Sequence, residues 1–150
     1  MKYKVNNTKA IQIGKNIMDM RCNNKELCKL FMYNWDTEID ILNFEDVTLF
    51  IDGDDISPEI GLLKLADEII TEIEKHIKNS KKYFREFFQS NDPEKYYLTE
   101  IYVGKITFLE GHTTKGFSFT FIYGNYPDAF QYKLKFKSDG WIIGFEGGPL

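Results

Sequence analysis

The sequence predicts an α+β fold in which one long amphipathic helix, at about 58–89, packs on a mostly antiparallel sheet with a C-terminal four-strand meander. Three observations lead to this prediction. Apolar residues recur in steps of three and four through 58–89, which is the period of an α-helix. After Tyr97, four runs of alternating apolar and polar residues follow one another, separated by turn signals. The chain has 150 residues, a length typical of one domain, so we expect a single α+β domain at 1–150.

The first clear strand signal begins at Thr37, whereas residues 1–36 have no clean period. Five apolar residues alternate with polar ones in the runs "EIDIL" and "DVTLFID": Ile39, Ile41, Val47, Leu49 and Ile51. Polar residues lie between the two runs. We therefore expect a hairpin at the start of the sheet.

The stretch "DGDDISPE" ends the second strand and starts the helix. Ser57 can cap the first helical turn, and Pro58 suits the first helical position. A straight helix over 58–89 would be about 48 Å long at 1.5 Å per residue, which is longer than a domain of this size. Ser80 interrupts the apolar stripe directly after Asn79. We therefore expect the helix to be kinked near 79–80.

Four strand-like runs make up the end of the chain: "LTEIYVGKITFLE", "GFSFTFIY", "FQYKLKFK" and "WIIGFE". The segments "GHTTKG", "GNYPDA" and "SDG" between them carry turn residues, so an antiparallel meander is expected. The third run alternates most regularly, which indicates one buried and one solvated face. The closing "GGPL" follows the last strand, and its glycines can let the terminal backbone lie close to a neighbouring element.

Aromatic residues are numerous, with 13 Phe, 9 Tyr and 2 Trp. Rings in that number favour β structure and a core of large flat side chains. The apolar phases of the helix and strands predict which side chains form this core. Those expected to be largely buried are Ile69, Ile73, Phe84, Phe119, Phe121, Leu134, Phe136 and Trp141.

No catalytic motif stands out. The two histidines, His76 and His112, have no second His or Cys at a metal-ligand spacing, and nothing places either beside a cysteine nucleophile. A calcium loop needs a glycine at its sixth position, whereas "DGDDISPE" has its glycine second. The chain also lacks G-x-S-x-G, H-E-x-x-H and a phosphate-binding glycine loop. We therefore expect no enzyme, no catalytic, metal-binding or cofactor-binding residues, and no cofactor.

Charge and hydropathy argue against further classes. A net charge of −4 and a sequence pI of about 5.2 have the wrong sign for a phosphate-binding surface, so we expect no nucleic acid partner. No run of about 18 apolar residues could span a membrane, and no secretion signal is recognisable at the start. We therefore expect a cytoplasmic protein with no membrane contact, in which Cys22 and Cys28 stay reduced.

Acidic residues are concentrated in one segment. The segment from Asp46 to His76, both ends included, contains nine acidic residues and two lysines. A helix start attracts negative charge, but the attraction fades beyond the first turn and does not account for all of these carboxylates. An acidic surface attracts basic proteins, and the alternative that stays open is a solubilising surface. The candidate partner-binding residues are Asp52, Asp54, Asp55, Asp67, Glu68, Glu72 and Glu74.

Two stretches resemble a known group of proteins. They are "DGDDISPEIGLLKLADEIITEIEKHI" and "FSFTFIYGNYPDAFQYKLKFKSDGWIIGFEGGPL". Together they resemble small uncharacterised bacterial proteins of the immunity type, some of which accompany secreted polymorphic toxins. The resemblance rests on pattern over the later part of the chain, and it transfers no functional residue. It implies an acidic, non-catalytic protein that neutralises a basic toxin domain by binding it.

Three functions are therefore weighed. The first is a protein-binding module, most concretely an immunity-type inhibitor that uses the acidic residues. The second is a small-ligand-binding or enzymatic domain with an aromatic-lined pocket between helix and sheet. The third is a structural subunit of a homo-oligomer, so both a monomer and a homodimer stay open.

Overall fold

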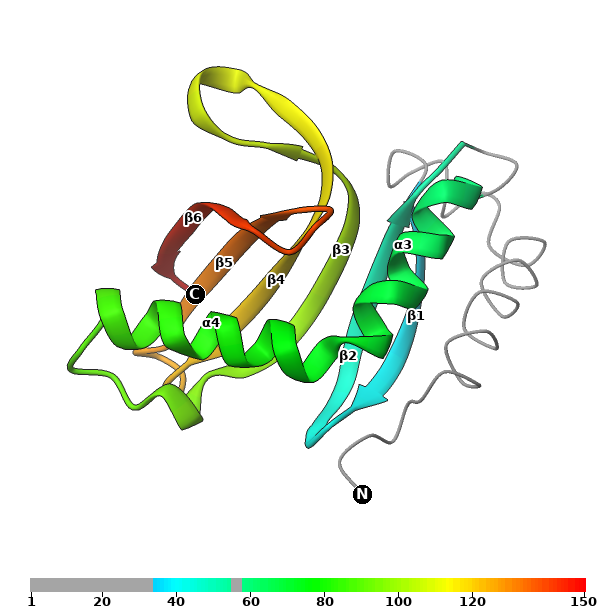
Figure 1. The fold of residues 1–150 in the computed structure, drawn as a ribbon. Helices are drawn as coiled ribbons and strands as arrows, with labels where there is room; N and C mark the ends of the chain where they lie inside the picture. Colours follow the sequence, from blue (N-terminus) through cyan, green and yellow to red (C-terminus); the bar gives the residue numbers. More distant parts are fainter. Residues whose placement is uncertain (1–33, 55–57) are drawn as a thin grey trace.

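The structure, a computed structural model, describes residues 34–54 and 58–150. These residues form a mixed α+β fold with one six-stranded sheet and two α-helices (Figure 1). The strands are β1 (Asn34–Ile41), β2 (Phe44–Asp52), β3 (Tyr97–Thr107), β4 (Thr113–Tyr123), β5 (Phe130–Lys137) and β6 (Ile142–Pro149). The helices are α3 (Ile60–Thr71) and α4 (Ile73–Phe87), with short 3-10 turns η1 (Pro93–Lys95) and η2 (Leu109–Gly111).

The sheet keeps the strands in chain order, from β1 at one edge to β6 at the other. The predicted hairpin is present as β1 and β2, joined by a turn in which Leu42 has a positive φ of 56°. β2 and β3 are parallel, because the two helices carry the chain back across the sheet before β3 begins. β3, β4, β5 and β6 then pair antiparallel in sequence, as the alternating runs indicate.

The prediction of one long helix over 58–89 is wrong. α3 ends at Thr71 and α4 starts at Ile73, and Glu72 between them has φ −104° and ψ 24°, outside the helical range. The helical segment also starts later and ends earlier than predicted, at Ile60 and Phe87. Figure 1 shows α3 lying along β1 and β2, while α4 crosses the strands of the meander. Because the sheet twists, one straight helix could not follow both parts of it.

The predicted kink near 79–80 is also absent, since α4 continues through both residues. Ser80 does lie on the apolar stripe and is fully buried. Its hydroxyl donates a hydrogen bond of 2.8 Å to the carbonyl oxygen of His76, one turn earlier. The helix thus satisfies a buried polar group internally, and the interrupted stripe needs no break.

The core lies between the helices and one face of the sheet and is strongly aromatic. Phe84 of α4 stacks on Tyr96 with ring centroids 3.9 Å apart and meets Phe121 of β4 edge-on at 5.2 Å. Phe117 and Phe136 stack across β4 and β5 at 4.6 Å. Seven of the predicted core residues are buried: Ile69, Ile73, Phe84, Phe119, Phe121, Leu134 and Phe136.

Trp141 is the core prediction that is wrong, since 72% of its surface is exposed. It precedes β6 and belongs to the β5–β6 turn. The backbone of Lys137 bonds to its carbonyl oxygen, and its own N–H donates to Asp139 Oδ1 at 3.0 Å. These turn contacts direct the indole away from the sheet face that the strand pattern had assigned to it.

The C-terminal tail does lie close against its neighbour, as its glycines indicate. Gly147 pairs with Tyr132, and a side chain at Gly147 would crowd the Tyr132 ring. The N–H of Leu150 bonds to the carbonyl oxygen of Ala129 at 2.9 Å. The tail therefore extends β6, the edge strand, along β5.

Candidate functional site

The predicted acidic residues fall into three groups, and the first lies at the end of β2. The Asp52 carboxylate accepts hydrogen bonds from the Tyr102 hydroxyl and from the N–H of Lys105. Burial, and next the hydrogen bond to Asp52, raises the pKa of the Tyr102 hydroxyl well above its usual range. These bonds fasten β2 to β3, so Asp52 has a structural role. Asp54 is exposed, while Asp55 lies outside the described residues.

The second group, Glu72 and Glu74, lies at the start of α4. Glu72 forms an ion pair with Lys75 at 2.8 Å, and this hydrogen bond lowers the pKa of Glu72. Glu74 is in the first turn of the helix. In a single long helix both residues would lie far from the helix N-terminus. The break at Glu72 creates a second N-terminus, and the positive end of its dipole attracts both carboxylates. The new helix start therefore accounts for Glu72 and Glu74 without a binding partner.

Asp67 and Glu68 on α3 form the third group. Glu68 begins the last turn of that helix, where the macrodipole repels negative charge, and Asp67 directly precedes it. Neither carboxylate forms an ion pair or hydrogen bond with any residue in the described part of the chain. Asp67 is half-buried, and this burial raises its pKa. Asp67 is thus a partly desolvated carboxylate without a compensating charge, beside an exposed acid.

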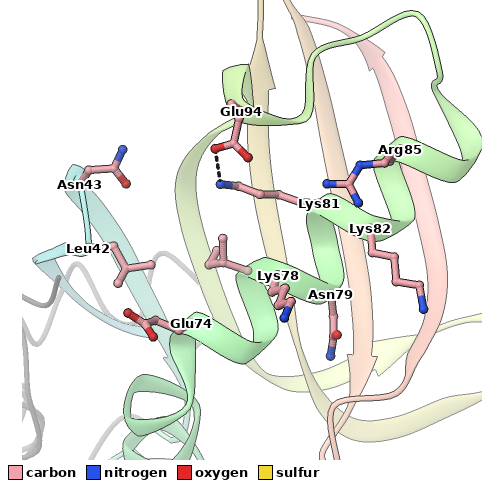
Figure 2. A pocket seen from close by; sticks show the side chains of 10 residues that line it. Leu42, Asn43, Glu74, Lys78, Asn79, Lys81, Lys82, Arg85 and Glu94 are labelled. Carbon is pink, nitrogen blue, oxygen red and sulfur yellow. Dashed lines mark hydrogen bonds and ion pairs between the residues drawn. The ribbon is translucent and has the colours of Figure 1, made fainter.

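A groove between α4 and the β1–β2 turn was not anticipated from the sequence (Figure 2). Its volume is about 900 Å³. Leu42 and Asn43 line it on the hairpin side, and α4 lines it on the other, together with Glu94 of η1. The lining residues of α4 are Glu74, Ile77, Lys78, Asn79, Lys81, Lys82 and Arg85.

The groove is positively charged although the protein is acidic. Four cations and two carboxylates line it. Lys81 pairs with Glu94 at 2.8 Å, the contact drawn in Figure 2. Lys78, Lys82 and Arg85 are exposed and form no ion pair within residues 34–54 and 58–150. Their spacing of four and three places them on one side of α4.

The basic residues of this groove are visible in the sequence, but the helix dipole offers another explanation for them. Bases late in a helical segment suit the negative end of the macrodipole. In the structure only Arg85 lies in the last turn of α4, so the dipole does not explain Lys78 or Lys82. The opposite wall comes from a turn more than thirty residues earlier in the chain, and sequence periodicity does not report such proximity.

The described residues offer little for acid–base or metal chemistry. His76 is buried against Phe117, Phe119 and Phe136, and burial lowers its pKa. Its Nδ1 has no hydrogen-bond partner. Among the residues that the structure describes, no three His, Cys, Asp or Glu side chains gather closely enough to hold a metal ion.

No model of a protein family, no curated protein and no solved structure matches this chain. Of the helices in the described ranges, neither is long and apolar enough to cross a membrane.

Proposed function

We propose that this protein is a non-catalytic protein-binding module of the immunity type, which neutralises a basic toxin domain by binding it. The observation that carries the proposal is the position of Asp67 and Glu68 on α3. They are the members of the predicted acidic site for which the described fold supplies neither a counter-charge nor a favourable helix end.

A partner cation explains why such residues are tolerated. Partial burial of the Asp67 carboxylate without a cation is unfavourable in the free protein, which is the cause of its raised pKa. A lysine or arginine of a bound partner would supply the missing charge, so burial at the interface would become favourable. Glu68, which is exposed beside it, adds to the attraction that guides a basic partner during association.

The other two functions have less support. An aromatic-lined pocket between helix and sheet requires open space beside the rings, whereas Phe84, Tyr96 and Phe121 lie in direct contact with one another. A homo-oligomer has no specific observation in its favour.

The test compares two isosteric substitutions, Asp67→Asn and Asp128→Asn. Both remove one carboxylate charge, and Asp128 is an exposed loop residue whose side chain forms no hydrogen bond or ion pair within the described chain. The binding partner is the purified product of each gene adjacent to that of this protein. We expect Asp67→Asn to weaken binding while the melting temperature stays the same or rises, because the substitution removes a desolvated charge. Asp128→Asn should alter neither quantity.

Two results would overturn the proposal. One is that the wild-type protein binds neither adjacent gene product. The other is that both substitutions leave the dissociation constant unchanged, which would make Asp67 an ordinary surface acid.

A further inference from the structure

We propose that the groove between α4 and the β1–β2 turn binds an extended acidic segment of a partner polypeptide. This surface is separate from Asp67 and Glu68, and the proposal does not depend on them. It rests on the shape of the groove, on three cations that form no ion pair within the described residues, and on two apolar lining residues.

Charge complementarity selects an acidic occupant. Lys78, Lys82 and Arg85 lie along one side of α4 and are exposed. Lys81 is already neutralised by Glu94, so the three remaining cations dominate the local field. Against a net charge of −4 for the whole chain, this groove is a local site of opposite sign. Carboxylates of a ligand would replace water around side chains that lack an ionic partner within the described chain.

The dimensions select an extended segment. From Glu74 to Arg85 the groove follows eleven helical steps, which is about 16 Å at 1.5 Å per residue. A peptide in extended conformation covers that length with about five residues. The groove has a volume of about 900 Å³, and Figure 2 shows its lining side chains spread along α4. A small compact ligand would leave much of its surface in water here, whereas a chain can lie along the helix.

The lining favours a polypeptide over a phosphate chain. Leu42 and Ile77 give the groove an apolar contact, and Asn43 and Asn79 supply amide donors and acceptors. Glu74 and Glu94 also face the groove, and they would repel the continuous charge of a nucleic acid backbone. A peptide can alternate acidic side chains with apolar ones and so avoid both carboxylates.

The experiment is an NMR titration of the full-length, isotope-labelled protein with a short peptide composed of glutamate and leucine. We expect backbone signals of the β1–β2 turn and of α4 between Glu74 and Arg85 to shift, and the shifts to diminish as salt is added. The triple variant Lys78→Gln, Lys82→Gln, Arg85→Gln should bind about tenfold more weakly, since three exposed charge contacts are lost. Glutamine is a good helix former, so α4 should persist.

A matched control removes the same charge elsewhere. Lys64, Lys105 and Lys137 are exposed and form no ion pair in the described part of the chain. Their triple replacement by Gln should leave peptide affinity within about twofold of the wild type, because these residues lie outside the groove.

Four results would overturn the proposal: no shifts with the peptide, shifts confined to other surfaces, equal weakening by both triple variants, or equal binding of a peptide with Gln in place of Glu.

Two further probes identify other occupants. Stronger binding of a single-stranded oligonucleotide at the same signals would make the groove a phosphate site. Shifts of these signals on raising the concentration of the protein alone would make its occupant a second copy. Either result also excludes the acidic segment proposed here.

Discussion

At the scale of single residues, His76 is a polar group in an aromatic core. Its ring meets Phe117 edge-on with centroids 5.1 Å apart, and its Nδ1 is buried with no hydrogen-bond partner among the described residues. Burial lowers its pKa, the neighbouring Lys75 lowers it further, and Glu72 opposes this. The native state therefore contains His76 as the neutral imidazole, and protonation of this ring favours unfolding.

This arrangement predicts that stability falls in mildly acidic solution. The unfolded chain takes up the proton at about pH 6.5, whereas the native state does so only at lower pH. The contribution of neutral His76 to the free energy of unfolding is complete above about pH 6.5. It is lost as the pH falls towards the lowered native pKa. Urea unfolding at about pH 7.5 and about pH 5.5 should show this loss in the wild type, and a smaller loss in His76→Leu. An identical pH dependence in both proteins would mean that His76 has the same pKa in the native and the unfolded state, which would contradict this account.

Gly116 shows where backbone contact sets the sequence. It is buried in β4, and an added Cβ would collide with the carbonyl oxygen of Phe136 on β5. Because that atom belongs to the backbone, the collision cannot be relieved by a rotamer change. Gly116→Ala should reduce the free energy of unfolding by about 1–3 kcal/mol. Gly148→Ala, where an added Cβ would meet no atom within 4 Å, should change it by less than about 0.5 kcal/mol. Equal effects of the two substitutions would show that the β4–β5 spacing adapts.

At the scale of elements, the break between α3 and α4 separates two helices that pack on different parts of the sheet. α3 contacts β2 and β3, while α4 contributes His76 and Phe84 to the rings of β4. The connection at Glu72 contains neither glycine nor proline. Packing therefore imposes the break against the local helical preference.

Ile73, the first residue of α4, is where this packing can be measured. It is fully buried directly after the break. Ile73→Ala should cost about 2–5 kcal/mol of unfolding free energy, because it leaves a cavity between helix and sheet. Ile60→Ala serves as control at the start of α3, where 81% of the isoleucine surface is exposed, and should cost less than about 0.5 kcal/mol. A loss at Ile73 no larger than at Ile60 would show that the start of α4 does not anchor the helix layer.

The elements also show what sequence reasoning can and cannot predict. Strands were predictable because half-buried antiparallel strands alternate, as Leu134 and Phe136 do on the buried face of β5. The break at Glu72 was not predictable from the sequence, because it is caused by the twist of the sheet on which the helices pack. Trp141 was predicted to be buried because it continues the alternation of the last strand. Its backbone N–H instead donates a hydrogen bond to Asp139 in the turn before that strand.

The candidate sites follow the same rule. The acidic residues could be found by counting charge, but their separation into helix starts and unpaired acids depends on the break. The basic groove requires Leu42 and α4 to meet, which the sequence pattern alone does not report.

At the scale of the whole molecule, charge of opposite sign lies on two successive helices. α3 presents Asp67 and Glu68, while α4 presents Lys78, Lys82 and Arg85. The apolar sides of both helices pack on the sheet, so within the described residues the charged side chains lie on their outer sides. This division of charge agrees with the proposal that the protein recognises others through polar surfaces.

The central claim, binding of a basic partner through Asp67 and Glu68, is tested most directly by the association rate with the adjacent gene products over a salt series. The comparison is between the wild type and the double variant Asp67→Lys, Glu68→Lys. Glu72 stays unchanged because it pairs with Lys75 at the helix break. We expect the wild-type rate to fall with salt, and the variant to associate about tenfold more slowly at low salt with little change in melting temperature. If the variant associates at the wild-type rate at every salt concentration, these carboxylates do not contact the partner and the claim is wrong.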